Sequence, residues 1–182
     1  DFSNKVCGIL EYLNMPNVKF SVAITQGKYT KNGCDSAEFL ISANAGETLK
    51  PLHKIASGGE LSRVMLSIKS VLLDKDNVGT MIFDEIDTGI SGRAAQVVGE
   101  KMAAIGRSRQ VIAVSHLPQI AAMADSHYLI EKHTDGERTR TSVNLLIGEE
   151  RTKEVARTLG GAEITDAALN NAGELISLAE KD

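Results

Sequence analysis

The chain has 182 residues, of which 42% are hydrophobic and 24% charged, and its net charge is -4. This length predicts one domain, or a domain with a short appendage, that buries about two-thirds of its unfolded surface without a disulfide or structural metal. The composition excludes a collagenous, low-complexity or wholly disordered chain. The acidic balance and an aromatic content of only 4% argue against a self-sufficient nucleic-acid-binding surface and against base stacking as its main binding mode.

The cysteines, the lengths of the apolar segments and the start of the chain indicate what kind of protein this is. Cys7 and Cys34 belong to no CxxC pair, which disfavours zinc and fits a reducing compartment. The sequence has no run of 18 apolar residues and no charged-then-apolar leader, so we predict neither a membrane span nor a signal peptide, and no membrane among the partners. Because the chain lacks a starting Met and opens in a predicted helix, we expect it to be a piece of something longer.

Hydrophobic periodicity predicts the order of helices and strands. Apolar residues at helical spacing predict a helix over 2–13, and alternation then predicts two strands, 18–25 and 37–44, joined by a hairpin loop over 26–36. Strands and helices alternate from 80 to 131, as in βαβ units with a parallel sheet. The other predicted helices cover about 61–72, 93–105, a short segment after Pro118, 150–159 and 165–180, and the other predicted strands cover about 81–83, 111–114, 127–131 and 141–147.

A helix start with two glycines is the first candidate phosphate site. Ser57 precedes the predicted helix, and Gly58 and Gly59 leave backbone amides uncovered at the positive end of the helix dipole. Ser57 and Glu60 also form the Ser-x-x-Glu pattern of a capping box, which needs no ligand. A cap does not require the glycines, because each weakens a helix by about 1 kcal/mol relative to alanine. The motif alone leaves both interpretations open.

Polar residues at two strand ends are the next candidates. Asp84 and Glu85 follow strand 81–83, at the end where open α/β sheets bind ligands. Asp84 is a candidate Mg²⁺ ligand and Glu85 a candidate to polarise water beside a γ-phosphate; the alternative is a solvated acidic turn. His116 follows strand 111–114 and is a candidate to contact that phosphate or water, the alternative being a structural or merely exposed histidine.

The order of these motifs resembles that of the ABC-type ATPases. SGGE is followed by a strand ending in DE, by D-x-G, and by a strand ending in Ser-His. The form DEID, where ABC transporters usually have DEPT, resembles the SMC-like branch. The strings ASGGELSRVMLSIKS, IFDEIDTGISG, VSHLPQIAAMAD and RTKEVARTLGG resemble one family of bacterial DNA-repair ATPases in that branch. The resemblance covers roughly residues 50–161.

This resemblance implies a role for each candidate residue. The signature motif contacts the γ-phosphate of ATP held by the opposite subunit, the Walker B pair supplies the Mg²⁺ ligand and the general base, and the D-loop crosses the dimer interface. Arg63, one turn into the signature helix, is a further candidate to face the partner's nucleotide. By position, the signature is Ser57, Gly58, Gly59 and Glu60, the Walker B pair is Asp84 and Glu85, the D-loop residue is Asp87, and the switch histidine is His116.

The resemblance also implies the architecture and the partners. No G-x-x-x-x-G-K-[ST] loop occurs in the sequence, so Walker A is absent. We therefore expect an α/β fold, the C-terminal lobe of an ABC/SMC-type ATPase head, with a mainly parallel sheet flanked by helices and an N-terminal antiparallel hairpin. Residues 1–15 would be a helix at the end of a coiled-coil arm, and residues 16–182 the lobe. The implied partners are the N-terminal Walker A lobe of the same protein, a second head in a homodimer, and DNA through the full-length protein.

The implied function is hydrolysis of ATP with Mg²⁺ between engaged heads, in double-strand-break repair and recombination in the bacterial cytoplasm at the nucleoid. This lobe alone is expected to be inactive. Two alternatives stay open: the nucleotide-binding domain of an ABC transporter, which DEID disfavours, and a non-catalytic dimerisation or DNA-binding module.

Overall fold

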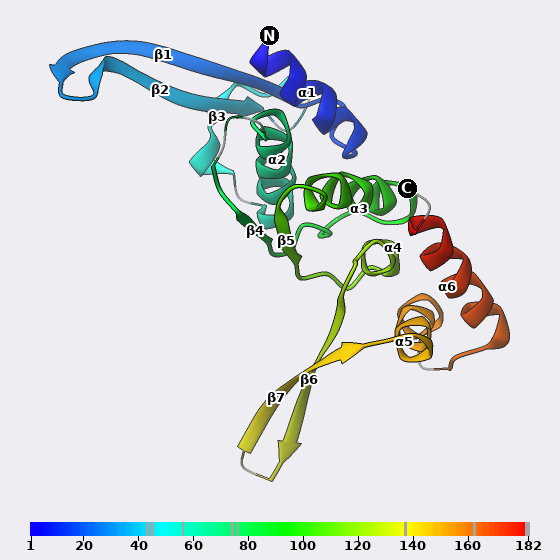
Figure 1. Ribbon diagram of the computed structural model, residues 1–182. Coiled ribbons are helices and arrows are strands. Elements are labelled where there is room, and N and C mark those ends of the chain that lie inside the picture. Colours follow the sequence, from blue (N-terminus) through cyan, green and yellow to red (C-terminus); the bar gives the residue numbers. More distant parts are fainter. Residues whose placement is uncertain are drawn as a thin grey trace. The chain divides into compact units, whose positions relative to one another are not determined.

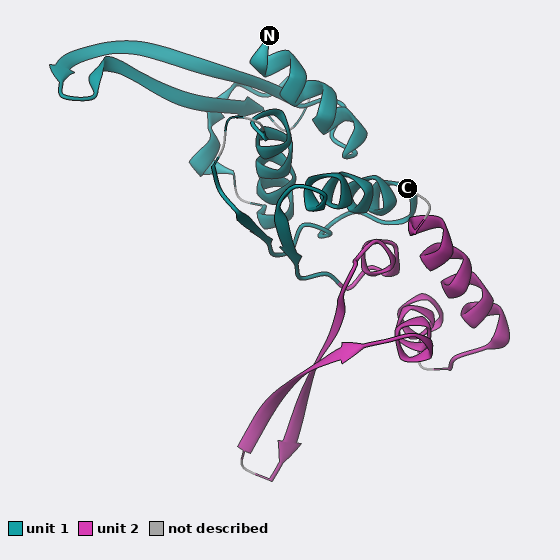
Figure 2. Ribbon diagram, viewed as in Figure 1, with its two compact units in different colours: residues 1–115 teal, residues 116–182 magenta. Residues whose placement is uncertain are grey.

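The computed structural model of the protein describes residues 1–42, 44, 46–55, 57–73, 75, 77–136, 138–161 and 163–180. The chain divides into two compact units, residues 1–115 and residues 116–182 (Figure 2). The elements of the first unit are α1 (Phe2–Tyr12), β1 (Lys19–Thr30), β2 (Gly33–Ser42), β3 (Lys50–Pro51), a 3-10 turn η1 (Leu52–Lys54), α2 (Gly58–Val71), β4 (Thr80–Phe83), α3 (Gly92–Gly106) and β5 (Gln110–Ala113).

The strands β1 and β2 form a long antiparallel hairpin, to which β3 adds a short third strand (Figure 1). The predicted hairpin was correct, but the predicted loop over 26–36 was too long, because β1 continues to Thr30 and β2 starts at Gly33. Polarity suggested a loop there, whereas these strands are exposed and carry polar residues for that reason. Gly33 has a φ of 112°, a value that favours glycine and permits the tight turn. Ala43, in the predicted strand 37–44, lies outside the described residues.

The core of the first unit joins the start of the hairpin to two helices. Val6 and Leu10 of α1 are fully buried, and they pack with Val64 and Ile68 of α2. The spacing of four residues within each pair places both side chains on one helix face. Three aromatic rings extend this core to the hairpin, with ring centroids 6.0 Å apart between Phe2 and Phe20 and 5.5 Å apart between Phe20 and Phe39. The signature helix α2 is thus anchored along its length by apolar contacts.

The strands β4 and β5 form the parallel part of the fold, as predicted. Met81 lies opposite Val111 and Phe83 opposite Ala113. Met81 and Phe83 are buried, whereas Ile82 between them points outward. Within the described chain this sheet has two strands, because the next strand, β6, pairs antiparallel with β7. The alternation of strands and helices did not reveal this, since it does not specify the partner of a strand.

The second unit is a hairpin with three helices, and its elements are α4 (Pro118–Ala122), β6 (His127–Asp135), β7 (Arg138–Leu146), α5 (Glu149–Gly160) and α6 (Asp166–Ala179). Its small core contains Val155 and Ala156 of α5 and Ala172 of α6, with Ala121 of α4 packed against it. Among the described residues, no helix is both long and apolar enough to cross a membrane.

Candidate functional site

The start of α2 carries the predicted signature residues. Ser57 is the N-cap of this helix, and its Oγ accepts a hydrogen bond from the backbone N–H of Glu60 at 3.4 Å. This contact is the first half of a capping box, and it is long for a hydrogen bond. The cap alone gives no reason for glycine at the next two positions.

The glycines are explained by the loop that follows β4. A Cβ atom at Gly59 would lie 2.8 Å from Thr88 Cβ and 2.8 Å from the Thr88 carbonyl oxygen. A Cβ atom at Gly58 would lie 2.8 Å from Glu85 Oε2. Two motifs far apart in the sequence, SGGE and DEID, therefore lie against each other within the first unit. Only glycine lets the helix backbone approach the loop this closely.

Side chains of α2 also hold this loop by hydrogen bonds. Ser62 Oγ donates to the Asp84 carbonyl oxygen at 2.9 Å. Arg63 Nη1 donates to the carbonyl oxygens of Ile86, at 3.3 Å, and Thr88, at 2.8 Å. Arg63 is only 5% exposed, so its guanidinium contacts its own loop instead of the molecular surface. Burial lowers the pKa of Arg63 and Glu60 opposes this effect, but an arginine stays protonated in either case.

Asp87 lies inside the loop and is 2% exposed. Its Oδ2 accepts a hydrogen bond of 2.6 Å from Ser115 Oγ, two residues after the end of β5. The carboxylate thus joins the ends of the two parallel strands, while the neighbouring Thr88 and Gly89 are exposed. The sequence did not predict Arg63 or Ser115 as a partner of this loop. The position of Ser115 beside His116, after a strand, was the one signal for such a role.

Asp84 and Glu85 are both exposed at the carboxyl end of β4. Glu85 has a φ of 56°, in the left-handed region that few residues other than glycine adopt. The turn is closed by a hydrogen bond from the Thr88 N–H to the Glu85 carbonyl oxygen at 3.1 Å. The described residues contain no cluster of three or more His, Cys, Asp or Glu that would hold a metal alone. Asp84 nevertheless fits Mg²⁺, which needs only one or two carboxylates when phosphates and water complete its coordination.

His116 is exposed and is the first residue of the second unit. Its predicted position beside Glu85 stays a prediction. The other predicted residues, Ser57 to Glu60 and Asp84 to Asp87, belong to the first unit and to one packed region of it.

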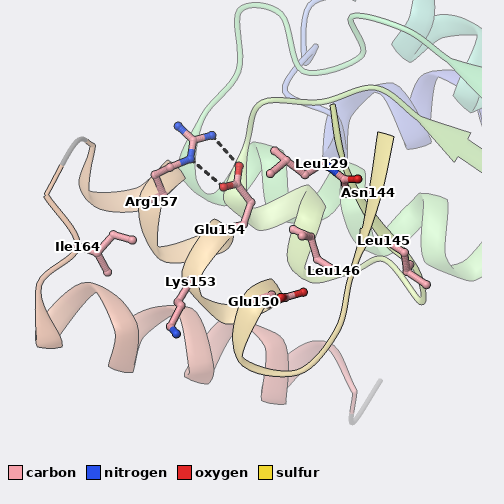
Figure 3. Close-up of a pocket in the computed structure, with 9 residues that line it drawn as sticks. All are labelled: Leu129, Asn144, Leu145, Leu146, Glu150, Lys153, Glu154, Arg157 and Ile164. Carbon is pink, nitrogen blue, oxygen red and sulfur yellow. Dashed lines mark hydrogen bonds and ion pairs between the residues drawn. The ribbon is translucent and has the colours of Figure 1, made fainter. Parts of the chain in front are cut away.

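The second unit has a pocket between its hairpin and α5, lined on one side by Leu129 and Leu146 and on the other by Glu150 and Lys153 (Figure 3). Two hydrogen bonds, of 2.8 and 2.6 Å, join Arg157 to Glu154 at its edge. None of the predicted site residues lines this pocket. The candidate site is therefore the region formed by the start of α2 and the loop after β4.

Comparison with known proteins identifies the family. No protein-family model matches the chain. The chain is 47% identical to the DNA repair protein RecN of Treponema pallidum, over 96% of this chain and 32% of that protein. It is 41% identical to RecN of Streptomyces coelicolor, over 100% of this chain and 34% of that protein. The chain belongs to the RecN family. It spans about a third of the length of these RecN relatives.

Solved structures confirm the fold at lower sequence identity. The SMC head domain of Pyrococcus yayanosii, with a coiled coil and joint, matches with a TM-score of 0.63 and 19% identity, over 87% of this chain and 29% of that one. An SMC head bound to the C-terminal winged-helix domain of ScpA matches with a TM-score of 0.53 and 17% identity, over 80% of this chain and 42% of that one. The predicted α/β fold with an antiparallel hairpin is thus correct, and it matches the fold of SMC head domains.

Proposed function

We propose that this chain is the RecN lobe that supplies the signature, Walker B and D-loop elements of an ATP-hydrolysing site in DNA repair. One observation carries this proposal: the glycines at the start of α2 lie directly against the loop that bears Asp84 and Glu85. A capping box does not need that contact, and a solvated acidic turn does not need a helix packed on it.

The residues divide the work by their positions. The start of α2 favours binding of a γ-phosphate that a second head holds. The donors there are the backbone amides of Gly58 and Gly59 and the hydroxyl of Ser57. Glu60, also in the first turn, completes the signature. The exposed Asp84 holds Mg²⁺, which when bound neutralises charge on the phosphates.

The remaining steps concern water and the D-loop. Glu85 orients and polarises the attacking water, and His116 contacts the same phosphate or water. Because Asp87 is buried against Ser115, we assign it to bracing the D-loop, and the exposed Thr88 and Gly89 to the contact with the second head.

The parallel sheet supports the need for a Walker A lobe. Ile82 is 70% exposed, Ile112 lies opposite it at 44%, and Val114 at 49% continues the same face. Parallel sheets are normally covered on both faces, and a two-stranded parallel sheet is unusual alone. We propose that the N-terminal Walker A lobe covers this apolar face, and that the chain without it does not hydrolyse ATP.

The relatives indicate the wider setting. The matching RecN proteins are bacterial and are named for DNA repair. One structural relative, with a TM-score of 0.52 and 17% identity, is an SMC ATPase, and for SMC ATPases ATP-driven dimerization and DNA-stimulated activation are described. We propose that two heads engage as a homodimer around ATP, that DNA is bound through the rest of the protein, and that the protein acts on double-strand breaks and recombination in the bacterial cytoplasm at the nucleoid.

The test is to co-express this chain with the Walker A lobe and to measure ATP hydrolysis and ATP-dependent dimerisation. We expect Glu85→Gln to reduce hydrolysis by about 10²–10⁴-fold, the usual contribution of a general base, without preventing dimerisation. The control is Glu11→Gln, at an exposed position of α1. A head whose hydrolysis is insensitive to Glu85→Gln and Asp84→Ala would instead be a non-catalytic dimerisation module, and tight association with a membrane permease would indicate a transporter.

A further inference from the structure

The function proposed for the site leaves one buried charge unexplained. Arg63 lies one turn beyond the signature and is 5% exposed, and its Nε is buried with no hydrogen-bond partner among the described residues. A buried cation is unfavourable unless its contacts compensate for lost hydration. Its guanidinium donates hydrogen bonds from Nη1 to the carbonyl oxygens of Ile86 and Thr88. The buried guanidinium is therefore placed to hydrogen-bond the backbone of the loop after β4.

The two carbonyl oxygens belong to the residues that follow Glu85. Glu85 itself has a φ of 56°, which is unfavourable for a side chain of its type and persists only when neighbouring contacts impose it. Ser62 holds the loop on one side of Glu85, at Asp84, and Arg63 holds it on the other side. Arg63 supplies two of these three hydrogen bonds from α2.

We propose that Arg63 is a positioning residue, which fixes the backbone after Glu85 and thereby holds the Glu85 carboxylate at the start of α2. Arg63 does not touch the nucleotide in this role and acts through the carbonyl oxygens of Ile86 and Thr88. The inference rests on the proposed function in assigning hydrolysis to Glu85, whereas the bracing of the loop stands on the hydrogen bonds alone.

Arg63 and the signature glycines lie on one helix, α2. In the proposed dimer, the signature of one head contacts the ATP held by the other head, whereas Glu85 acts on the ATP of its own head. Arg63 joins the helix that bears the signature to the loop that bears Glu85.

Hydrogen exchange on the 182-residue chain tests the bracing without any assumption about hydrolysis. Arg63→Met keeps much of the side-chain length and removes the donors. We expect exchange at the amides of Thr88 and Ile90 to rise by at least about tenfold, with the amides of α1 unchanged. Arg63→Lys, whose ammonium is compact and lacks the planar fork, should give an intermediate increase. The control is Arg140→Met, at an exposed position of β7.

Two results would overturn the bracing: unchanged exchange at Thr88 and Ile90, or an equal rise throughout the first unit, which would make Arg63 a general stabiliser. If Arg63→Met does not fold, the Arg63→Lys variant decides between the same outcomes.

Kinetics of the assembled head test the effect on Glu85. Arg63→Met should lower kcat by about 10–100-fold, the effect of a catalytic group misplaced by about 1 Å, and change KM for ATP by less than about twofold. In single-turnover measurements on the Glu85→Gln background, Arg63→Met should cause no further loss. An equal loss on both backgrounds would contradict the role assigned to Arg63. If Glu85→Gln itself has no effect, the proposed function fails, and the exchange result still decides the bracing.

Discussion

Replacing Gly59 with alanine tests the close packing of α2 against the loop after β4. The new Cβ atom would lie 2.8 Å from Thr88 Cβ and from the Thr88 carbonyl oxygen, and 3.1 Å from the Glu85 carbonyl oxygen. Ordinary contact begins at 3.4 Å, so the loop would have to retreat by about 0.6 Å. It cannot do so freely, because Arg63 holds the Thr88 carbonyl oxygen at 2.8 Å.

The expected magnitude follows from two opposing effects. Overpacking costs about 1–3 kcal/mol, and the helix preference of alanine returns up to about 1 kcal/mol. With the full return from alanine, we expect Gly59→Ala to lower the free energy of unfolding of the first unit by up to about 2 kcal/mol. Urea unfolding followed by circular dichroism measures this change, with an unchanged m-value as the check on the transition.

The matched control is Gly8→Ala in α1, where a Cβ atom meets nothing within 4 Å. This substitution should stabilise the chain by about 0.5–1 kcal/mol. If Gly59→Ala is as stable as Gly8→Ala, the close contact between α2 and the loop does not exist, and the explanation of the glycine pair is wrong.

Three further predictions concern neighbouring features. Gly58→Ala should change the free energy of unfolding by less than about 1 kcal/mol, because its new Cβ meets the movable end of the Glu85 side chain. It should nevertheless lower kcat of the assembled head, because it displaces the Glu85 carboxylate. A loss of stability as large as that of Gly59→Ala would refute this prediction. Ile82→Lys, at an exposed position, should change the free energy of unfolding of the chain by less than about 0.5 kcal/mol, yet it should abolish co-purification with the Walker A lobe. Retained co-purification would show that the lobe does not cover the β4–β5 face. In the folded state, burial and, to a smaller extent, the charge of Arg151 lower the pKa of His127 below its usual 6.5. The unfolded state therefore binds the proton more readily, and the free energy of unfolding should fall as pH drops below 6.5. Unfolding measured at several pH values should show a smaller fall for His127→Asn, and an identical pH dependence for both proteins would contradict the assignment.

Local patterns predicted the elements of this fold well, because helix and strand periodicity depend on neighbouring residues. The helices α1 and α2 and the parallel strands β4 and β5 lie close to their expected positions. The length of the β1–β2 hairpin was underestimated, since exposed strands can be as polar as loops. The antiparallel pairing of β6 was not predictable, because the partner of a strand is decided by contacts distant in the sequence.

The candidate site shows the same division between local and distant causes. The N-cap role of Ser57 was predicted from the three residues that follow it. Thr88 explains why position 59 is a glycine and why Arg63 is buried. Because Thr88 is 25 residues beyond Arg63, no local sequence pattern indicates its contacts with α2. The side chain of Asp87 is buried against Ser115, which its motif did not indicate, and the predicted place of its loop at a dimer interface stays a prediction.

The shared ATP site is tested most directly by mixing two inactive heads. One carries Ser57→Arg, which obstructs the signature, and the other carries Glu85→Gln, and each is assembled with its Walker A lobe. In a mixed dimer, one of the two sites combines an intact Glu85 with an intact signature. Random pairing makes about half of the dimers mixed, so hydrolysis should recover to about a quarter of the unmodified rate. A mixture no more active than the two variants measured separately would contradict a signature that acts on the ATP of the opposite head.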